Sequence, residues 1–527
     1  MSRRVWSKIN HFFGILVYLV FLAYFGTSIA SLIINFEKLK WWGFTLNFIV
    51  LILEMIGPSY VIYFMVQLLD GILQVNKIEY NLDKLEEHPK LAVMIPVRNA
   101  HPLILRETLE GFKRQTYPNF ELWVGDDFSD EEFSSKYREI VNDLNFNYHY
   151  GENRSYKAGI LNQITPKTDA KYIAFFDVDQ IPKPKILEKF VAILEQNPQY
   201  SFVQAKFDFR EVKNLMHTWE MINYYQLACA QSGKMGIDNV LWHGCNACFR
   251  RESAYPLPEG KLSEDFDHTI QLLSKGEKGC WLEEIGVMTL ATDTFEHKMS
   301  QMFRWTTGQV GAFKDHWKKY FNSKLTSKQS LDLFISSTLT LVLSSMYFVG
   351  ILYAILYLLK VPIFRALVLE DIAMIIVPIL IGSVYLVMIT ATTVYSIRHS
   401  SYKINIFQIM FFLLFSSLTA PILLIPTVQG LLGKNKLIPG KTQWNRKIRL
   451  YLISAICSFF GLLYLALGIF SILDNFKVLI DWYPGGNYFY TFFLLIAFML
   501  TAVFPFIVVV KHRYRKSLFL GDEYVYI

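Results

Sequence analysis

Long apolar runs at both ends of the chain constrain its fold more than any other feature. Two runs, 12–34 and 44–69, precede a charged and mixed stretch that extends from about residue 76 to about residue 331. Further apolar runs follow it, at 333–359, 372–395, 406–432, 451–473 and 488–510. About 20 consecutive apolar residues are enough for a helix to cross a bilayer. The pattern therefore predicts a polytopic membrane protein with one large polar domain.

The basic residues predict how this protein is oriented. The net charge is +7, and the excess lies in short runs beside the apolar segments, not in one nucleic-acid-binding stripe. These runs include SRR near the start, GKNK and KTQWNRKIR before the last spans, and KHRYRK near the end. Cytosolic loops are enriched in Lys and Arg. We therefore expect the polar domain and both termini to be cytosolic, at the plasma (inner) membrane, with no nucleic-acid partner.

The apolar run at 406–432 differs from the others. Basic stretches flank it on both sides, and it contains Pro421 and Pro426. We interpret it as an in-to-in element, interfacial or re-entrant. Six true spans then remain, two before the polar domain and four after it. The alternative is a seventh true span with an external C-terminus.

The chain is thus expected to contain four parts. They are an N-terminal membrane region with two transmembrane helices (1–75), a cytosolic domain (76–330), a C-terminal membrane region (331–510) and a short cytosolic tail (511–527). The C-terminal region would hold four transmembrane helices, the in-to-in element at about 406–432 and a polar segment at about 433–449.

The polar domain alternates strand and helix patterns. LAVMIPV (91–97), ELWVGDD, KYIAFFDVD (171–179) and YSFVQAKF read as strands, with helical patterns such as ILRETLEGFKRQ and KILEKFVAILEQ between them. This alternation predicts a Rossmann-like α/β domain, a parallel sheet covered by helices. Ligands bind such sheets at the carboxyl ends of the strands. Acidic pairs fall at two of these ends.

The first pair is Asp177 and Asp179 in FFDVDQIP. Carboxylate oxygens suit a hard divalent cation, whose remaining positions a diphosphate can fill. Such a cation would neutralise charge on a leaving nucleoside diphosphate. The alternative is a solvated turn.

The second pair is Asp126 and Asp127 in VGDDFSDEE, which could accept hydrogen bonds from a base or a ribose. In SYKAGILNQI, Lys157 stands beside small residues and could reach a phosphate or the base. The alternative for this segment is a solvated helix start.

A third acidic segment is KLSEDFDHTIQLL, with Glu264 and Asp265 before a helical pattern. Asp265 could act as a general base toward an acceptor hydroxyl. The alternative is an N-cap at Ser263 with acidic first-turn residues. We expect His268 to be supporting structure.

A polar and aromatic cluster, QMFRWTTGQVGAF, lies just before the third apolar run. The guanidinium of Arg304 suits a diphosphate, and the flat ring of Trp305 suits the apolar face of a sugar. The alternative is a Trp-Arg anchor at the membrane interface. The lone C-x-x-C pair of Cys245 and Cys248 offers too few ligands for tetrahedral zinc.

Taken in order, these segments resemble the membrane-embedded processive glycosyltransferases, which include the cellulose, chitin and hyaluronan synthases. The similarity rests on the strand-end D-D, the K-A-G-x-L-N-like segment, the D-x-D, the S/T-E-D and the Q-x-x-R-W, and is greatest to bacterial cellulose synthase catalytic subunits. It implies a GT-A catalytic fold and a divalent cofactor, Mg²⁺ or Mn²⁺.

The resemblance also implies roles for the strand-end residues. Asp126 and Asp127 would hold the uridine and ribose, and Lys157 would contact the nucleotide. Asp177 and Asp179 would bind the diphosphate and the metal, with Asp179 the favoured metal ligand.

Other roles follow from the later motifs. Asp265 would be the base, beside Glu264 in the same catalytic segment. Gln301, Arg304 and Trp305 would bind the diphosphate and the terminal sugar of the acceptor. HGCNACFRR resembles the strand that lines the acceptor site, which implicates Gly244 and Cys245.

The KTQWNRKIR stretch occupies the place of the family's gating loop, so Trp444, Arg446 and Lys447 could close over bound UDP. It lacks the gating patterns of both cellulose and hyaluronan synthases, and Ser263 replaces the usual threonine. Both departures bear on the identity of the sugar.

The expected function is an inverting, processive glycosyltransferase that polymerises a UDP-sugar and exports the polymer through its own channel. The favoured donor is UDP-glucose, with cellulose or a related β-glucan as the product. The second choice is UDP-GlcNAc, with a chitin-like or hyaluronan-like product. The expected partners are the donor, the growing polysaccharide and the bilayer, with room for an accessory export subunit. The alternatives are a non-processive enzyme that acts on a lipid acceptor and, from another class, a transporter with a large cytosolic domain.

Overall fold

The computed structural model describes residues 3–152, 156–292, 295–321, 323–364 and 402–434, with short pieces between residues 390 and 400 and between 462 and 469. Several expectations lie outside the described residues. They concern the runs at 451–473 and 488–510, most of 372–395, nearly all of 433–449 and the tail at 511–527.

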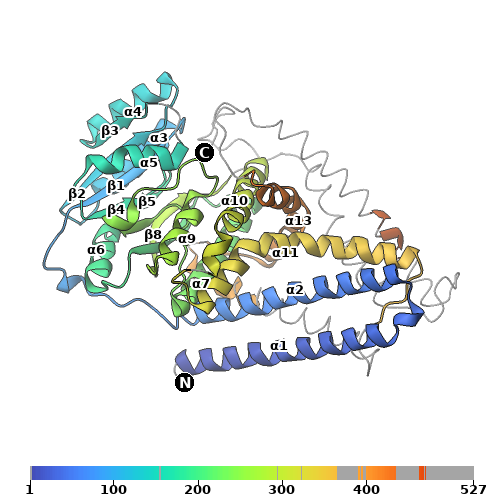
Figure 1. Ribbon diagram of the computed structural model, residues 1–527. Helices are drawn as coiled ribbons and strands as arrows, with labels where there is room; N and C mark the ends of the chain where they lie inside the picture. The colour runs from blue at the N-terminus through green and yellow to red at the C-terminus, as the bar shows by residue number, and fades with distance from the viewer. Residues whose placement is uncertain are drawn as a thin grey trace.

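Three long helices arise from the apolar runs. α1 (Arg3–Ile34), α2 (Trp41–Ile72) and α11 (Ser327–Leu358) each contain 32 residues, and α2 lies beside both of the others (Figure 1). Helices of this length extend about 48 Å. Pro58 lies inside α2 without ending it. Among the described residues, α1 and α2 are long and apolar enough to cross a membrane.

An eight-stranded sheet forms the centre of the polar domain. Its strands are β1 (Leu91–Val97), β2 (Phe120–Asp126), β3 (Asn147–Tyr150), β4 (Tyr172–Phe175), β5 (Ile181–Pro182), β6 (Phe202–Arg210), β7 (Ala247–Arg250) and β8 (Gly279–Leu290). They lie in the order β3-β2-β1-β4-β7-β6-β8-β5. The pairs among β1 to β4 are parallel, as the sequence predicts.

The prediction of a wholly parallel sheet is wrong at two strands. β7 runs antiparallel to β4 and β6, and β5 runs antiparallel to β8. After β6 the chain passes through a long helix that packs on α2, and it re-enters the sheet from the end at which β4 finishes. Phe175 at the end of β4 therefore pairs with Ala247 at the start of β7. This direction brings the residues before β7 beside those after β4.

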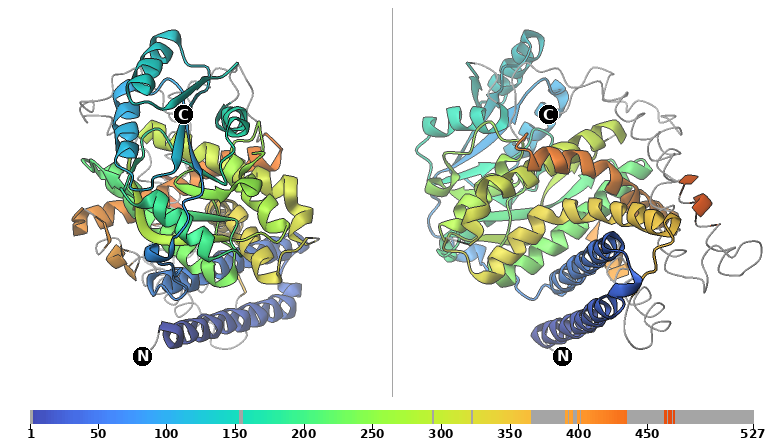
Figure 2. Two further views of the ribbon diagram at one scale, coloured as in Figure 1. Left: turned by 90° about the vertical axis from the view of Figure 1, so that its left-hand side faces the viewer. Right: turned by 45° about the vertical axis from the view of Figure 1, so that its right-hand side comes forward.

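Helices alternate with the strands as expected (Figure 2). They are α3 (Pro102–Lys113), α4 (Glu131–Asp143), α5 (Tyr156–Ile164), α6 (Ile186–Gln196), α7 (Leu215–Lys234), α8 (Arg251–Ala254), α9 (Glu264–Ser274) and α10 (Phe295–His316). The expected strand at 171–179 ends early, at Phe175, and its acidic residues lie in the turn that follows.

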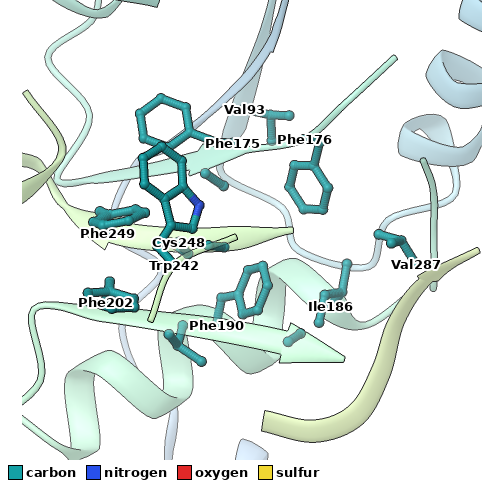
Figure 3. Close-up of a cluster of buried hydrophobic side chains, with 14 of the residues drawn as sticks. Val93, Phe175, Phe176, Ile186, Phe190, Phe202, Trp242, Cys248, Phe249 and Val287 are labelled. Atoms are coloured by element: carbon teal, nitrogen blue, oxygen red, sulfur yellow. The ribbon is translucent and has the colours of Figure 1, made fainter. Parts of the chain in front are cut away.

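Large aromatic side chains fill the core beneath the end of β4 (Figure 3). The Phe202 and Phe249 rings stack at 4.9 Å between centroids, and Phe175 lies 5.4 Å from Trp242. These residues come from β4, β6, β7 and the segment before β7, and all are buried. Dense packing of this kind holds neighbouring backbone in one arrangement. It therefore fixes the strand ends that carry the acidic residues.

The run at 406–432 forms one helix, α13 (Ile406–Leu431), which begins with a capping box between Asn405 and Gln408. Near its start, Gln408 donates a 3.0 Å hydrogen bond to Thr218 of α7. Near its end, a Cβ on Gly430 would lie 2.9 Å from the Thr307 carbonyl oxygen of α10. Both ends of α13 therefore contact helices of the polar domain.

Candidate active site

Three predicted acidic residues lie where parallel strands end. Asp126 is the last residue of β2, and Asp177 and Asp179 follow β4, with β1 between the two strands. Because the carboxyl ends of parallel strands share one edge, the structure places these segments close together.

The carboxylate of Asp126 points into the protein. Its Oδ1 accepts a hydrogen bond from the Ser129 amide at 2.9 Å. Its Oδ2 accepts hydrogen bonds from the hydroxyls of Ser134 at 2.7 Å and Tyr148 at 2.6 Å. Asp126 therefore stabilises the loop after β2, a structural role that the sequence interpretation did not include.

Asp127 connects this loop to α5. Its Oδ1 accepts a hydrogen bond from the Tyr156 amide at 2.9 Å, and its carbonyl oxygen accepts one from Arg98 at 2.7 Å. The start of α5, which carries Lys157, is thereby held beside the strand ends. Lys157 Nζ then donates a 2.5 Å hydrogen bond to Asp177 Oδ1. Burial lowers the pKa of Lys157, but nearby negative charge, first that of Asp177, outweighs it and raises the pKa above its usual value.

Asp179 is held from the opposite side by the end of β8. Thr289 Oγ1 and the Leu290 amide donate hydrogen bonds of 2.8 and 3.1 Å to the same oxygen, Oδ2. Burial, and then the charge of Asp177, raise the pKa of Asp179. Two neighbouring carboxylates that repel each other in this way favour a cation between them.

The donor set of this pair fits a divalent cation only in part. Among the described residues, no group of three or more His, Cys, Asp or Glu side chains is arranged to hold a metal. Asp177 and Asp179 supply hard oxygen ligands of the kind that Mg²⁺ or Mn²⁺ accepts. The remaining positions would be filled by water and by the diphosphate of a donor, as with cations that bind together with a nucleotide.

Asp265 and Gly244 meet at the same edge. A Cβ on Gly244 would lie 3.0 Å from Asp265 Oδ2 and 3.6 Å from Lys157 Nζ. Gly244 also has φ +84°, a conformation that favours glycine. The antiparallel direction of β7 produces this approach, which joins the S-E-D segment to the D-x-D segment through Lys157.

The ionisation of Asp265 is tuned by its surroundings. Burial, and then the charge of Glu264, raise the pKa of Asp265 to about 7. The Phe266 amide, Lys157 and Arg304 oppose this shift but do not outweigh it. Ser263 occupies the N-cap position of α9, yet its side chain makes no capping hydrogen bond. A simple capping role thus does not account for the S-E-D segment.

The Q-x-x-R-W residues lie in the middle of α10. Arg304 is close enough to Asp265 to lower its pKa, and its buried Nε has no hydrogen-bond partner among the described residues. Gln301 Oε1 accepts a 2.8 Å hydrogen bond from Lys298. Trp305 as a whole residue remains 39% exposed. An unpaired buried guanidinium nitrogen near Asp265 is suited to an anionic ligand.

α10 approaches the S-E-D segment very closely. A Cβ on Gly308 would lie 2.2 Å from Ser263 Oγ and 2.8 Å from its amide nitrogen. Glycine at this position lets the Q-x-x-R-W helix pack directly on the start of α9. The two motifs therefore lie side by side in the structure.

Other predicted residues have simpler surroundings. Cys245 Sγ accepts a 3.0 Å hydrogen bond from Gln180, and the four described cysteines are free thiols. His268 is buried, and its Nε2 lies 2.8 Å from the Ser253 carbonyl oxygen, as expected of supporting structure. The gating candidates Trp444, Arg446 and Lys447 fall outside the described residues.

Sequence reasoning missed a buried pair beside the site, Glu220 and Lys298, which are joined at 2.7 Å. Lys298 stands three residues before Gln301, a spacing that places both on one face of a helix and could have indicated it. Nothing in the sequence around Glu220 points to this contact.

Comparison with known proteins shows which enzymes this part of the chain resembles. Residues 88–308 match the family model described as "Glycosyltransferase like family 2". A probable glucomannan 4-beta-mannosyltransferase 15 of Arabidopsis thaliana is 26% identical over 258 residues, which is 45% of this chain and 48% of that protein. The cellulose synthase catalytic subunit [UDP-forming] of Pseudomonas fluorescens is 27% identical over 247 residues, which is 44% of this chain and 32% of that protein. Each alignment thus covers less than half of the relative.

A solved mannosyltransferase from Pyrobaculum calidifontis, in complex with GDP-Man and Mn²⁺, superposes with a TM-score of 0.49 at 15% identity, covering 73% of this chain and 99% of that one. The family match supports the GT-A fold expected for the catalytic part of the chain. It also confirms the enzyme class of this part. Residues 88–308 thus resemble glycosyltransferase family 2 domains.

Proposed function

We propose that the whole protein is an inverting, processive glycosyltransferase that extends a β-linked polysaccharide from a nucleotide-sugar donor and exports it across a membrane. One observation carries the proposal. Asp265, whose pKa burial raises to about 7, lies beside Gly244 and Lys157, and Lys157 in turn binds Asp177 of the Asp177–Asp179 pair. A base with a pKa near neutrality, next to a site for a diphosphate, is what glycosyl transfer requires.

The proposed reaction is a single displacement. Asp265 accepts the proton of an acceptor hydroxyl, whose oxygen attacks the anomeric carbon of the donor. The bond from that carbon to the diphosphate oxygen breaks, and the configuration inverts. Arg304 and Lys157 take up negative charge on the departing nucleoside diphosphate. A cation held by Asp179 and Asp177 would neutralise further charge there.

The expected donor is UDP-glucose, with cellulose or a related β-glucan as product. The cellulose synthase relative favours this choice, because its name describes it as UDP-forming. The glucomannan 4-beta-mannosyltransferase relatives favour a second candidate, the polymerisation of nucleotide-activated mannose. UDP-GlcNAc remains a further alternative. Trp305, with its exposed ring, would stack on the terminal sugar in each case.

Processive export places the site against a membrane. α1 exposes large apolar side chains along much of its length, which suits contact with lipid. The contacts of α13 with α7 at one end and α10 at the other favour an element that lies along the domain over one that crosses the bilayer. The domain boundaries, the remaining spans, the cytosolic orientation and an accessory export subunit belong to the same proposal.

A donor panel tests the proposal. The full chain, purified in detergent with Mn²⁺, would be incubated with labelled UDP-glucose, UDP-GlcNAc, GDP-glucose and GDP-mannose. We expect a high-mass product from one donor, its loss on chelation, and its digestion by a linkage-specific β-glucanase or β-mannanase. A single sugar added to lipid would contradict processivity. Failure to release a nucleoside diphosphate from any donor would reject the proposed function.

A further inference from the structure

We propose that Glu220 and Lys298 form a buried positioning pair that aligns the acceptor end of the site with its donor end; this inference rests on the proposed function. Lys298 Nζ lies 2.7 Å from Glu220 Oε1, and the two side chains are only 2% and 11% exposed. Glu220 belongs to α7 and Lys298 to the first turns of α10. The sequence motifs assign no role to either residue.

Lys298 fixes two residues of the Q-x-x-R-W motif at once. Its ammonium donates a 2.8 Å hydrogen bond to Gln301 Oε1 and lies 4.8 Å from the centre of the Trp305 ring. The three residues are spaced i, i+3 and i+7, so they form one stripe along α10. An ammonium has three donors, and a cation is attracted to an indole face. One charged group therefore orients both the side-chain amide of Gln301 and the ring of Trp305.

Glu220 connects this stripe to the metal-binding carboxylate. Its Oε2 accepts a 2.7 Å hydrogen bond from the Thr292 amide. Thr292 follows the end of β8, where Thr289 and Leu290 hold Asp179. The two oxygens of Glu220 thus bind the segment that orients Asp179 and the lysine that orients Trp305. A shift of α10 against β8 would have to break this link.

Stability alone is a poor explanation for such a pair. Burying two charges costs desolvation energy, and apolar side chains of similar volume often stabilise a core equally well. A charge pair also fixes geometry, because each N–H group of the ammonium points at one particular acceptor. Here the Lys298 ammonium contacts residues that are proposed to bind the diphosphate and the acceptor sugar.

The chain offers a matched control in Lys206 and Glu283. This pair is also buried, with Nζ and Oε1 2.8 Å apart, and it joins β6 to β8. Its side chains contact Tyr395 and Trp281, and within the described part of the chain neither of them bonds to α10 or to Asp179. Lys206→Met should therefore cost stability of the same kind without changing how donor and acceptor meet.

The test compares Lys298→Met, Glu220→Gln and Lys206→Met in the full chain, with the donor that the unaltered protein uses. We expect Lys298→Met and Glu220→Gln to lower polymer formation about 10- to 100-fold, as misalignment of reacting groups does. The KM for the donor should stay within about threefold, since Asp127, Lys157 and Arg304 remain in place to bind the nucleotide. The ratio of nucleoside diphosphate released to sugar transferred should rise in both variants and stay unchanged in Lys206→Met.

A double-mutant cycle separates positioning from general loss of structure. If Lys298 acts through Trp305, adding Lys298→Met to Trp305→Ala should cause little further loss of transfer. Fully additive losses, or a release-to-transfer ratio in Lys298→Met equal to that in Lys206→Met, would overturn the inference and leave the proposed function intact. An unaltered protein that is inactive with every donor would instead reject the proposed function.

Discussion

At the scale of single residues, the proposed chemistry depends most on the carboxyl group of Asp265. Asp265→Asn keeps the size of the side chain but removes the base, so we expect transfer to fall about 100- to 10,000-fold. Binding of UDP with Mn²⁺ should persist, because Asp127, Lys157 and Asp179 are unchanged. Labelled-donor turnover and calorimetric titration with UDP measure the two effects.

Asp267→Asn provides the control for this substitution. Asp267 lies on the same helix, and its carboxylate pairs with His316 at 3.0 Å. Its loss should lower stability and leave most of the transfer rate. Polymer formation at a near-normal rate in Asp265→Asn would show that another group is the base.

The pH dependence of transfer follows from the same group. Burial raises the pKa of Asp265 to about 7, and a general base acts in its deprotonated form. We therefore expect kcat/KM for the donor to rise as the pH increases through about 7. Measurement between about pH 5.5 and about pH 9 at saturating Mn²⁺ would show this limb. A profile that is flat across neutrality would contradict the assignment.

Stability should respond to pH with the opposite sign. The folded state holds the Asp265 proton more tightly than the unfolded state, where the pKa is about 3.9. The contribution of this group to the free energy of unfolding therefore falls as the pH rises from there through about 7. Asp265→Asn removes the penalty, so its gain in unfolding temperature over the unaltered protein should be larger at about pH 8 than at about pH 5. An equal difference at both pH values would count against the buried carboxyl.

Motif spacing identified candidate residues but not the separate role of each residue. Asp126 and Asp127 are adjacent in the sequence, yet Asp126 is used by Ser129, Ser134 and Tyr148, and Asp127 holds the start of α5. Side chains of neighbouring residues at a strand end point in different directions. The loops packed around these side chains decide which one bonds within the protein and which one can contact a ligand.

At the scale of elements, the packing of α10 on α9 depends on Gly308. A methyl group there would meet Ser263 at 2.2 Å and force the two helices apart. We expect Gly308→Ala to lower transfer about 10- to 100-fold by moving Trp305 and Arg304 away from Asp265. Transfer rate and unfolding temperature, measured together, would show the effect.

Gly26→Ala is the matched control for this change. Gly26 lies in α1, where an added Cβ meets nothing within 4 Å, and alanine favours helix. Its transfer rate should equal that of the unaltered protein. If Gly308→Ala behaves in the same way, close approach of the two helices is not needed for activity.

At the scale of the whole molecule, the glycosyltransferase domain is docked on the long helices through a buried ion pair. Lys234 of α7 and Asp332 of α11 lie 2.6 Å apart, with exposed fractions of 3% and 0%. Asp332 also accepts a hydrogen bond from Gln67 of α2 at 2.6 Å. A Cβ on Gly233 would meet the Gln67 carbonyl oxygen at 2.2 Å, so α7 and α2 touch through their backbones. Three helices are thus held together by one polar network.

Removal of one partner should weaken this junction strongly. Asp332→Ala leaves the Lys234 ammonium buried and unpaired, which costs about 3–5 kcal/mol. Asp238→Ala breaks a pair with Lys278 of the same length, 2.6 Å, whose side chains are 39% and 40% exposed. Exposed pairs contribute less than about 1 kcal/mol. The unfolding temperature in detergent should therefore fall far more for Asp332→Ala than for Asp238→Ala. Equal shifts in the two variants would contradict a buried junction.

The sequence by itself determined the local features of this protein. The described apolar runs, at 12–34, 44–69, 333–359 and 406–432, became long helices, and the alternating segments of the polar domain became strands and helices. The acidic residues came at strand ends. These features are local because hydrophobic periodicity and helix or strand preference act over neighbouring residues. The order of the motifs was enough to identify a glycosyltransferase domain.

The tertiary structure decided how those motifs meet. The antiparallel direction of β7, which brings Gly244 beside Asp265, and the link between Glu220 and Lys298, which are 78 residues apart, exist only once the sheet and α7 have packed. Contacts of this kind depend on which surfaces, distant in the sequence, pack against each other. Local helix and strand preferences do not determine that packing. The sequence motifs therefore predict the class of reaction, while the alignment of the reacting groups depends on packing in the folded core.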